Sequence, residues 1–153
     1  MMNPDTRRVG LIESNCRPTA YLIGLQTTPL SSLALYQLVC TGFALSKVKA
    51  MVASSPLYGT ASVLDRILGH SNRSRQIGPG VLLNARQSAT ALQYAQVLEH
   101  ATAVFGSQQM AEQWLGKSCR YLAGHVPLDI AGNWWGFQAV EEYLQKIEFG
   151  IYH

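Results

Sequence analysis

Apolar residues recur every three or four positions along most of the chain, which is the spacing of amphipathic helices. Residues 1–29 are the exception, so we expect a loosely ordered arm there, with a short apolar segment at residues 21–25 and no assigned role. A first helix is predicted from Ser31 or Ser32 to Gly42, and a second one over residues 45–52, stopped by Pro56.

The next stretch predicts two short helices around a small turn. After an expected turn at residues 56–59, Thr60 is predicted to cap a helix that ends at Gly69. Its apolar face would consist of Val63, Leu64, Ile67 and Leu68. The polar segment 71–77 follows and stops at Gly78. Two such helices are the ingredients of a helix-turn-helix.

The second half of the chain predicts three further helices. Asn84 is expected to cap the longest one, which runs to Gly106, and Ser107 to cap a shorter one that ends at Gly116. The shorter helix should bury Met110, Ala111, Trp114 and Leu115, and the last helix, which ends at Gly150, should bury Phe137, Val140, Leu144 and Ile147. One member of the Trp134–Trp135 pair is expected in the core.

No alternating strand pattern of useful length occurs, so the predicted class is all-α. The predicted division is an arm at residues 1–29, a helix-turn-helix unit at 30–83 and a small helical unit at 84–153. With 153 residues, of which 48% are hydrophobic, the chain can form one domain or two small ones that share a core.

The charges are few and unevenly distributed. Only 14% of the residues are charged, which favours a surface covered by partners. Residues 1–86 carry nine Lys or Arg against three acids, a net charge of +6, whereas residues 87–153 carry three against six, a net charge of −3. The two halves are expected to meet different partners, with the basic half suited to phosphate, unless so few charges fell this way by chance.

Cysteine usage and hydropathy indicate a cytoplasmic protein. Cys16, Cys40 and Cys119 are odd in number and widely spaced, which argues against a disulfide framework or a zinc site. Residues 18–46 carry no charge, but polar residues and a proline interrupt them, so no membrane span is expected. The start of the chain does not show a basic segment, an apolar run and a small-residue cleavage site in the order that a signal peptide has.

Motifs for catalysis are missing, so we expect a protein that is not an enzyme and has no cofactor or metal. Glu141 and Glu142 are adjacent on a helix and point about 100° apart, which prevents them from sharing an acid/base site. The remaining enzyme hypothesis is a thiol nucleophile at Cys119 assisted by His125. His70, His100 and His153 have no neighbour at metal-ligand spacing.

Residues of the C-terminal half resemble the toxin-binding domain of the Xre/MbcA/ParS antitoxins. The motifs, in order, are residues 101–106, Ala111, Trp114-Leu115, residues 122–129 and the closing Gly136, Val140, Leu144, Ile147 and Gly150. A weaker likeness to the Xre-like helix-turn-helix of the same family runs through residues 68–71 and 73–75 and continues into Leu83 and Gln87-Ser88, with Ser74 where the family commonly has Thr. An atypical Ser-Ser-Pro turn precedes it.

The resemblance implies a bacterial type II antitoxin. Its partner would be an adjacent RES-domain toxin that consumes NAD or transfers ADP-ribose, and a homodimer within a larger hetero-oligomer would block the toxin and repress its own operon. Residues 30–83 would be the DNA-binding domain and residues 84–153 the toxin-binding and dimerisation domain. Expected toxin-binding residues are Trp135, Glu141, Glu142, Glu148, Phe149, Gly150, Ile151, Tyr152 and His153. The last five would enter the cleft of the toxin, unless the tail frays in solvent.

The resemblance also implies contact with operator DNA. Expected DNA-binding residues are Ser71, Asn72, Arg73, Ser74, Arg75 and Gln76, whose side chains suit base edges and phosphates. The alternative is that they form only the polar side of a surface helix. The alternative function is a DNA-binding transcriptional or partition regulator without a toxin partner.

Overall fold

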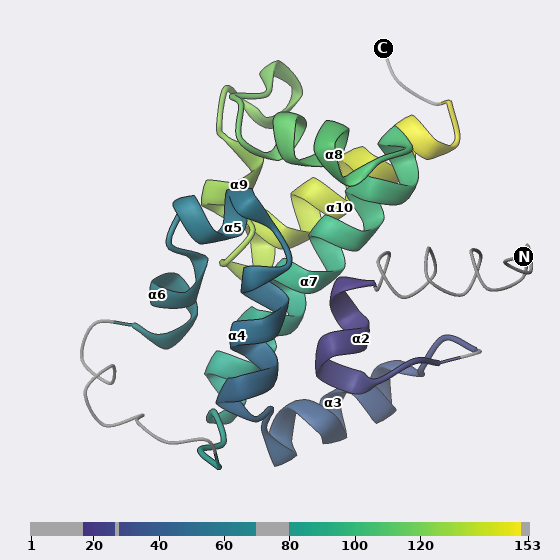
Figure 1. Ribbon diagram of the computed structural model, residues 1–153. Coiled ribbons are helices and arrows are strands. Elements are labelled where there is room, and N and C mark those ends of the chain that lie inside the picture. The colour runs from purple at the N-terminus through teal and green to yellow at the C-terminus, as the bar shows by residue number, and fades with distance from the viewer. Residues whose placement is uncertain (1–16, 27, 70–79, 151–153) are drawn as a thin grey trace, which may run out of the picture.

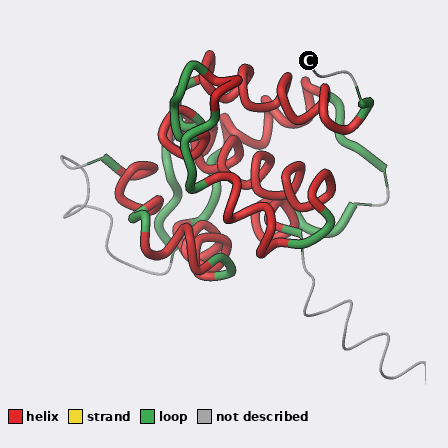
Figure 2. The backbone as a smooth tube through the Cα atoms, turned by 90° about the horizontal axis from the view of Figure 1, so that it is seen from above, coloured by secondary structure: helices red, strands yellow, loops and turns green. Residues whose placement is uncertain are grey.

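The computed structural model describes residues 17–26, 28–69 and 80–150. Helices form these parts of the chain, and their one β feature is an isolated bridge between Ala44 and Leu82, so the predicted all-α class is confirmed. A long helix, α7 (Ala85–Phe105), runs through the middle, with the other helices packed around it (Figure 1). Viewed from above, the described chain is helices joined by short loops (Figure 2).

Helix α7 begins and ends where the sequence predicts. The side chain of Asn84 accepts from the backbone N–H of Gln87, and the Gln87 side chain accepts from the backbone N–H of Asn84, which is a complete capping box. The helix ends at Gly106, whose φ of 91° favours glycine. It carries ten buried residues and contacts helices that precede it and helices that follow it in the chain. Both halves of the chain therefore pack against α7.

The expected arm contains a core helix, which corrects that prediction for residues 18–23. Helix α2 (Pro18–Ile23) places Pro18 in its first turn, packs against α4 and α7, and buries Leu22. Thr19 donates to the carboxylate of Glu99 on α7 at 2.9 Å. Six residues are too few for an independently stable helix, so these tertiary contacts stabilise it.

Helices α3 (Ser32–Thr41) and α4 (Leu45–Ala53) follow the prediction, with Ser31 capping α3. The predicted turn at residues 56–59 is wrong, because Ser55 accepts from the N–H of Tyr58 and starts α5 (Pro56–Thr60). Thr60 therefore ends a helix and does not begin one. Helix α6 (Val63–Leu68) starts after Ser62, which has a left-handed backbone and no side-chain cap, and ends at Gly69 as predicted.

The C-terminal part comprises α8 (Gln108–Leu115), the 3-10 turn η2 (Arg120–Leu122), α9 (Pro127–Ile130) and α10 (Trp134–Glu148). Ser107 caps α8 as predicted. Met110 is 51% exposed, which contradicts its predicted burial, because Ala111 and Leu115 occupy the core side of α8.

Buried residues from both halves form one hydrophobic cluster. Polar contacts also join the halves: the buried Tyr58 hydroxyl donates to the Tyr94 carbonyl at 2.6 Å, and the Ser55 hydroxyl donates to Glu112. The division at residues 83/84 stays a prediction, and the buried residues on both sides of it form one core.

Candidate protein-binding site

The C-terminal helices are held by a short, highly constrained loop. Cys119 donates its backbone N–H to the His125 carbonyl at 2.9 Å, and Gly124 donates to the Cys119 carbonyl at 2.9 Å. Ala123 and Gly124 take positive φ values of 56° and 81°. Pro127 then starts α9, in which Leu128 is buried and Asp129 is exposed. The sequence between η2 and α9 thereby holds α9 against the core.

Helix α10 lies close to α9 because of Gly136. A Cβ atom at Gly136 would lie 2.0 Å from the carbonyl oxygen of Ile130, so no side chain fits. The side chain of Asn133 caps the helix by accepting from the N–H groups of Trp135 and Gly136. Trp134 and Trp135 are 53% and 78% exposed, which contradicts the expectation that one of them is in the core. Phe137 is the first apolar residue of α10 that is buried.

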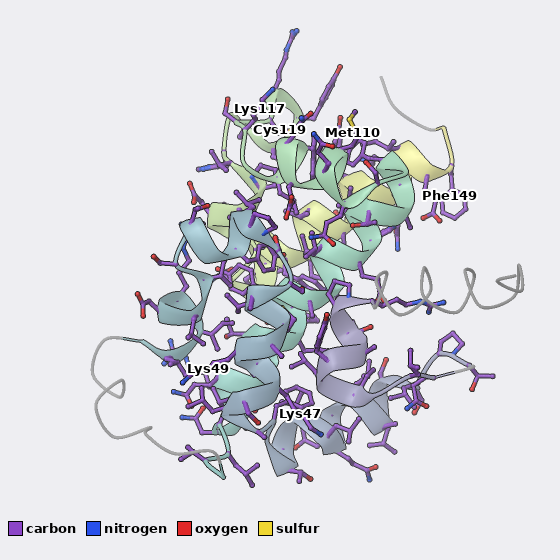
Figure 3. The ribbon with its side chains drawn as sticks, in the orientation of Figure 1. Lys47, Lys49, Met110, Lys117, Cys119 and Phe149 are labelled. Carbon is purple, nitrogen blue, oxygen red and sulfur yellow. The ribbon has the colours of Figure 1, made fainter. Side chains whose placement is uncertain are left out.

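Three of the predicted toxin-binding residues share one face of α10. Trp135, Glu142 and Phe149 follow each other at seven-residue spacing, which places them along one stripe of a helix. All three are exposed, and Phe149, the C-cap residue, reaches 71%. Figure 3 shows Phe149 projecting at the end of α10. We refer to these three residues as the outer stripe of α10.

The other two predicted glutamates on α10 turn toward α7. Glu141 binds His100 Nδ1, and Glu148 Oε2 lies 3.1 Å from His100 Nε2. The hydrogen bond to Glu141 raises the pKa of His100 above its ordinary value, the contact with Glu148 adds to this, and burial opposes it. These two carboxylates connect α10 to α7 and so help to hold α10 in place. Glu142, on the outer stripe, remains exposed.

A row of four aromatic rings crosses α7, α8, α10 and η2, and three of them are half-buried against the core. Tyr121 stacks on Tyr143 with centroids 5.5 Å apart, Tyr143 stacks on Trp114 at 5.8 Å, and Trp114 contacts Phe105 at 5.4 Å. Tyr121, at the outer end, is 58% exposed. Large rings with polar neighbours are enriched at protein interfaces. The row was not predicted, because the four residues come from four separate elements.

The remaining predicted toxin-binding residues lie at the chain end. Gly150 is exposed, with a φ of 69°, whereas Ile151, Tyr152 and His153 lie outside the described residues. The seven-residue spacing of Glu141 and Glu148 could have shown that both carboxylates need a partner, but it does not identify His100 as that partner. That spacing puts both carboxylates on one face of α10, close to the buried Leu144, where a carboxylate needs a partner.

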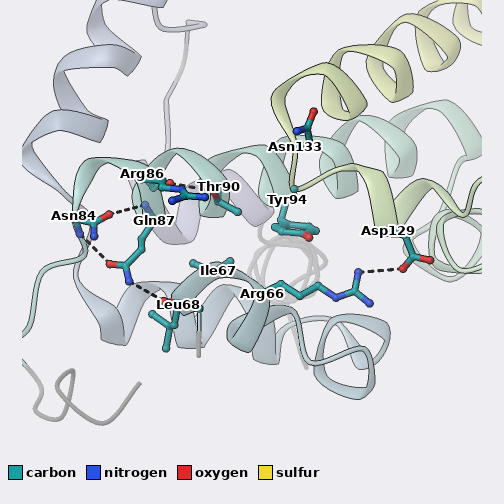
Figure 4. A pocket seen from close by; sticks show the side chains of 12 residues that line it. Arg66, Ile67, Leu68, Asn84, Arg86, Gln87, Thr90, Tyr94, Asp129 and Asn133 are labelled. Carbon is teal, nitrogen blue, oxygen red and sulfur yellow. Dashed lines mark hydrogen bonds and ion pairs between the residues drawn. The ribbon is translucent and has the colours of Figure 1, made fainter. Parts of the chain in front are cut away.

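All six predicted DNA-binding residues, Ser71, Asn72, Arg73, Ser74, Arg75 and Gln76, lie outside the described parts of the chain. The elements on either side of them meet at a pocket of about 500 Å³ (Figure 4). Arg66 on α6 pairs there with Asp129 at 3.1 Å, and Arg86 comes from the first turn of α7. The Gln87 amide donates to the Leu68 carbonyl at 3.0 Å and so links the end of α6 to the start of α7.

The residues considered for catalysis are not arranged as a reactive pair. The Cys119 side chain is buried and His125 is exposed, and their hydrogen bond joins backbone atoms. Within the described residues, no three His, Cys, Asp or Glu side chains gather at metal-binding distance. No helix in the same parts of the chain has the length and apolar character that crossing a membrane requires.

A search of the curated proteins found no match to this chain. A family model does match over residues 100–150, a segment that begins at His100 and includes the four rings from Phe105 to Tyr143 and all of α10. The resemblance of the C-terminal half to this family is thereby confirmed, while the likeness of the upstream part to a helix-turn-helix is not covered by the match. Residues 100–150 of the chain match the model of the family described as the antitoxin Xre/MbcA/ParS C-terminal toxin-binding domain.

Proposed function

We propose that this protein is the antitoxin of a type II toxin–antitoxin pair in the bacterial cytoplasm. It binds a toxin encoded beside it through α8–α10 and blocks it. The toxin is of the RES type, which consumes NAD or transfers ADP-ribose. The observation that carries the proposal is the family match over residues 100–150.

The surface of the matched segment supports binding to another protein. The outer stripe of α10 offers two exposed aromatic side chains separated by a carboxylate, and Tyr121 adds a third ring nearby in the same segment. Buried aromatic side chains supply much of the binding energy at protein interfaces. An exposed carboxylate such as Glu142 is complementary to the arginines with which NAD-handling pockets bind phosphate.

The N-terminal half supplies the second part of the proposal, which is repression of the operon by a homodimer. Support comes from the excess of Lys and Arg over residues 1–86, and from Arg66 and Arg86 beside the connection between α6 and α7. Two copies would present two such connections to neighbouring DNA half-sites. If the adjacent gene is harmless, the alternative function applies, which is a transcriptional or partition regulator without a toxin partner.

Growth rescue tests the proposal. The adjacent gene is expressed alone, with the full-length protein, or with a Trp135→Ala/Phe149→Ala variant, and colony counts and cellular NAD are followed. The wild type should restore growth and NAD. The variant should fail, because loss of one interface aromatic weakens binding by about 30-fold.

The matched control is Leu25→Ala, which removes an 82% exposed side chain outside the segment of the family match and should rescue like the wild type. Titration of purified toxin with each variant gives the dissociation constants. A harmless neighbour would overturn the toxin partnership. Full rescue by the double variant would overturn the role of the outer stripe of α10.

A further inference from the structure

Helix α3 is apolar on two opposite faces. Leu35 and Val39 pack inward against the core, whereas Leu33, Tyr36 and Cys40 line the outer face with Gln37 between them, at spacings of three, four and seven. Leu33 and Tyr36 are each 65% exposed, and no residue of α3 is buried. We refer to Leu33, Tyr36, Gln37 and Cys40 as the outer face of α3.

Exposed apolar side chains on the side of a helix that faces away from the core are often covered by a partner. The outer face of α3 is extended at one end by Leu82, which is 56% exposed and lies close to Gly42, the residue after α3. Contiguous apolar surface of this kind marks an interaction site on soluble proteins. A partner is therefore expected to cover this face.

The absence of charge on α3 favours a second copy of this chain over DNA or a charged protein as the partner. Residues 18–46 contain no Lys, Arg, Asp or Glu, so α3 itself carries no cation for DNA phosphate and no charge to match an oppositely charged protein, and the next lysine, Lys47, lies on α4. An uncharged apolar face can meet an identical face without repulsion, and a two-fold axis makes such a contact self-complementary.

We propose that the outer face of α3 binds the same face of a second copy of this chain, as an antiparallel pair of helices with Tyr36 near the two-fold axis. Ten residues make a helix about 15 Å long. Stable interfaces bury about 800 Å² per partner, so the contact must also include the Leu82 segment. The dimer should dissociate measurably on dilution.

The location of α3 leaves the toxin-binding part accessible. Figure 1 shows α3 at one end of the molecule and α8 at the other, with α7 running between them. Leu82 belongs to the connection between α6 and α7, so pairing at this face joins two copies beside that connection. The inference supplies a surface for the dimer of the proposed function, and its test is separate from toxin binding.

The first test measures the mass of the full-length protein by light scattering over a wide range of concentration. The wild type should change from one chain to two as concentration rises. Tyr36→Glu and Leu33→Glu should raise the dissociation constant of the dimer at least tenfold, because each places a charge in the contact. Met110→Glu, at an exposed apolar residue on α8, is the matched control and should dimerise like the wild type.

A second test needs no variant. Cys40 is exposed on this face and Cys119 is buried, so peptide-resolved alkylation reports on the face while Cys119 serves as the slow internal reference. Alkylation of Cys40 should slow several-fold as protein concentration rises through the dimer transition.

Three results would overturn the proposal. They are a single-chain mass at every concentration, a dimer whose dissociation constant both glutamate variants leave unchanged, and Cys40 protection that does not depend on concentration. The last result would show that residues of the same chain, such as 1–16, cover the face. A harmless adjacent gene would remove the toxin partnership and leave these measurements unaffected.

Discussion

The two ends of α7 differ in how the helices around them place their apolar residues. At the C-terminal end, α10 buries Phe137, Val140 and Leu144 on one face and leaves isolated rings and charges on the opposite one. At the N-terminal end, α3 turns apolar residues both inward and outward and carries no charge. An outer surface that mixes rings and charges suits a different protein, whereas a neutral apolar one suits a second copy.

Both ends also contain a glycine that lies against a backbone carbonyl, and its replacement should have the largest effect. A Cβ atom would lie 2.0 Å from the Ile130 oxygen at Gly136 and 2.3 Å from the Leu83 oxygen at Gly42. We expect Gly136→Ala and Gly42→Ala each to lower the free energy of unfolding by about 2 to 4 kcal/mol, measured by urea denaturation.

The matched control for these glycines is Gly59→Ala, since a Cβ atom there meets nothing within 4 Å. It should raise the free energy of unfolding by at most about 1 kcal/mol, because alanine favours a helix more than glycine does. Toxin binding should fall most for Gly136→Ala and dimerisation most for Gly42→Ala. Equal stability of Gly136→Ala and the control would contradict the close approach of α9 and α10.

The next prediction asks whether the two ends unfold together. All three tryptophans, Trp114, Trp134 and Trp135, lie in the second half, so their fluorescence reports on that half, while circular dichroism reports on every helix. Because both halves share α7, the two signals should show one coincident transition. Leu98→Ala, at a fully buried position of α7, should shift both by about 3 kcal/mol.

Leu25→Ala is the control for this comparison, because its exposed side chain should contribute less than about 0.5 kcal/mol. Separate transitions for fluorescence and circular dichroism would show that the halves are independent domains. That outcome would favour the boundary at residues 83/84 as a true domain division.

The smallest expected effect is a change with pH in the free energy of unfolding, and it arises only at the C-terminal end of α7, where His100 lies. The pKa of His100 is raised, so the protonated ring stabilises the folded state, and this stabilisation is fully present below the ordinary histidine pKa of about 6.5. It is lost as pH rises through the raised pKa of the folded protein. Relative to His100→Gln, the wild type should therefore gain about 1 kcal/mol of unfolding free energy on the acidic side, near pH 6.

The control for the pH effect is Glu142→Gln, a neighbour on the exposed face of α10, which should leave the pH profile close to that of the wild type. Urea denaturation at several pH values measures all three proteins. If His100→Gln and the wild type differ by the same amount at every pH, protonation of His100 does not stabilise the fold.

Helices with a one-sided apolar period and a polar cap were predictable from the sequence. The start of α7 at Asn84 and of α8 at Ser107 follow from local capping chemistry. The prediction for α2 failed because tertiary contacts stabilise that helix, through burial of Leu22 and the bond to Glu99 from another helix. The start of α5 was a local signal that was missed, since Ser55 caps the helix by accepting from the N–H of Tyr58 and Pro56 occupies its first turn.

The candidate site was predictable only where local sequence patterns determine the exposure of a side chain. The exposure of Trp135 and Phe149 is consistent with the sequence prediction, and their contact with a toxin stays a prediction. The pairing of His100 with Glu141 depends on the register of α7 against α10, which no local pattern specifies. The row from Tyr121 to Phe105 likewise requires the packing of four elements.

The side chain of Gln87 has a consequence for how this protein can evolve. Its amide binds both the start of α7 and the last carbonyl of α6, so the two ends of the connection at residues 69–83 are linked by groups outside residues 70–79. Substitutions within 70–79 remove neither of the groups that form these hydrogen bonds. Selection can therefore alter this stretch while the hydrogen-bonding groups that bracket it are inherited unchanged.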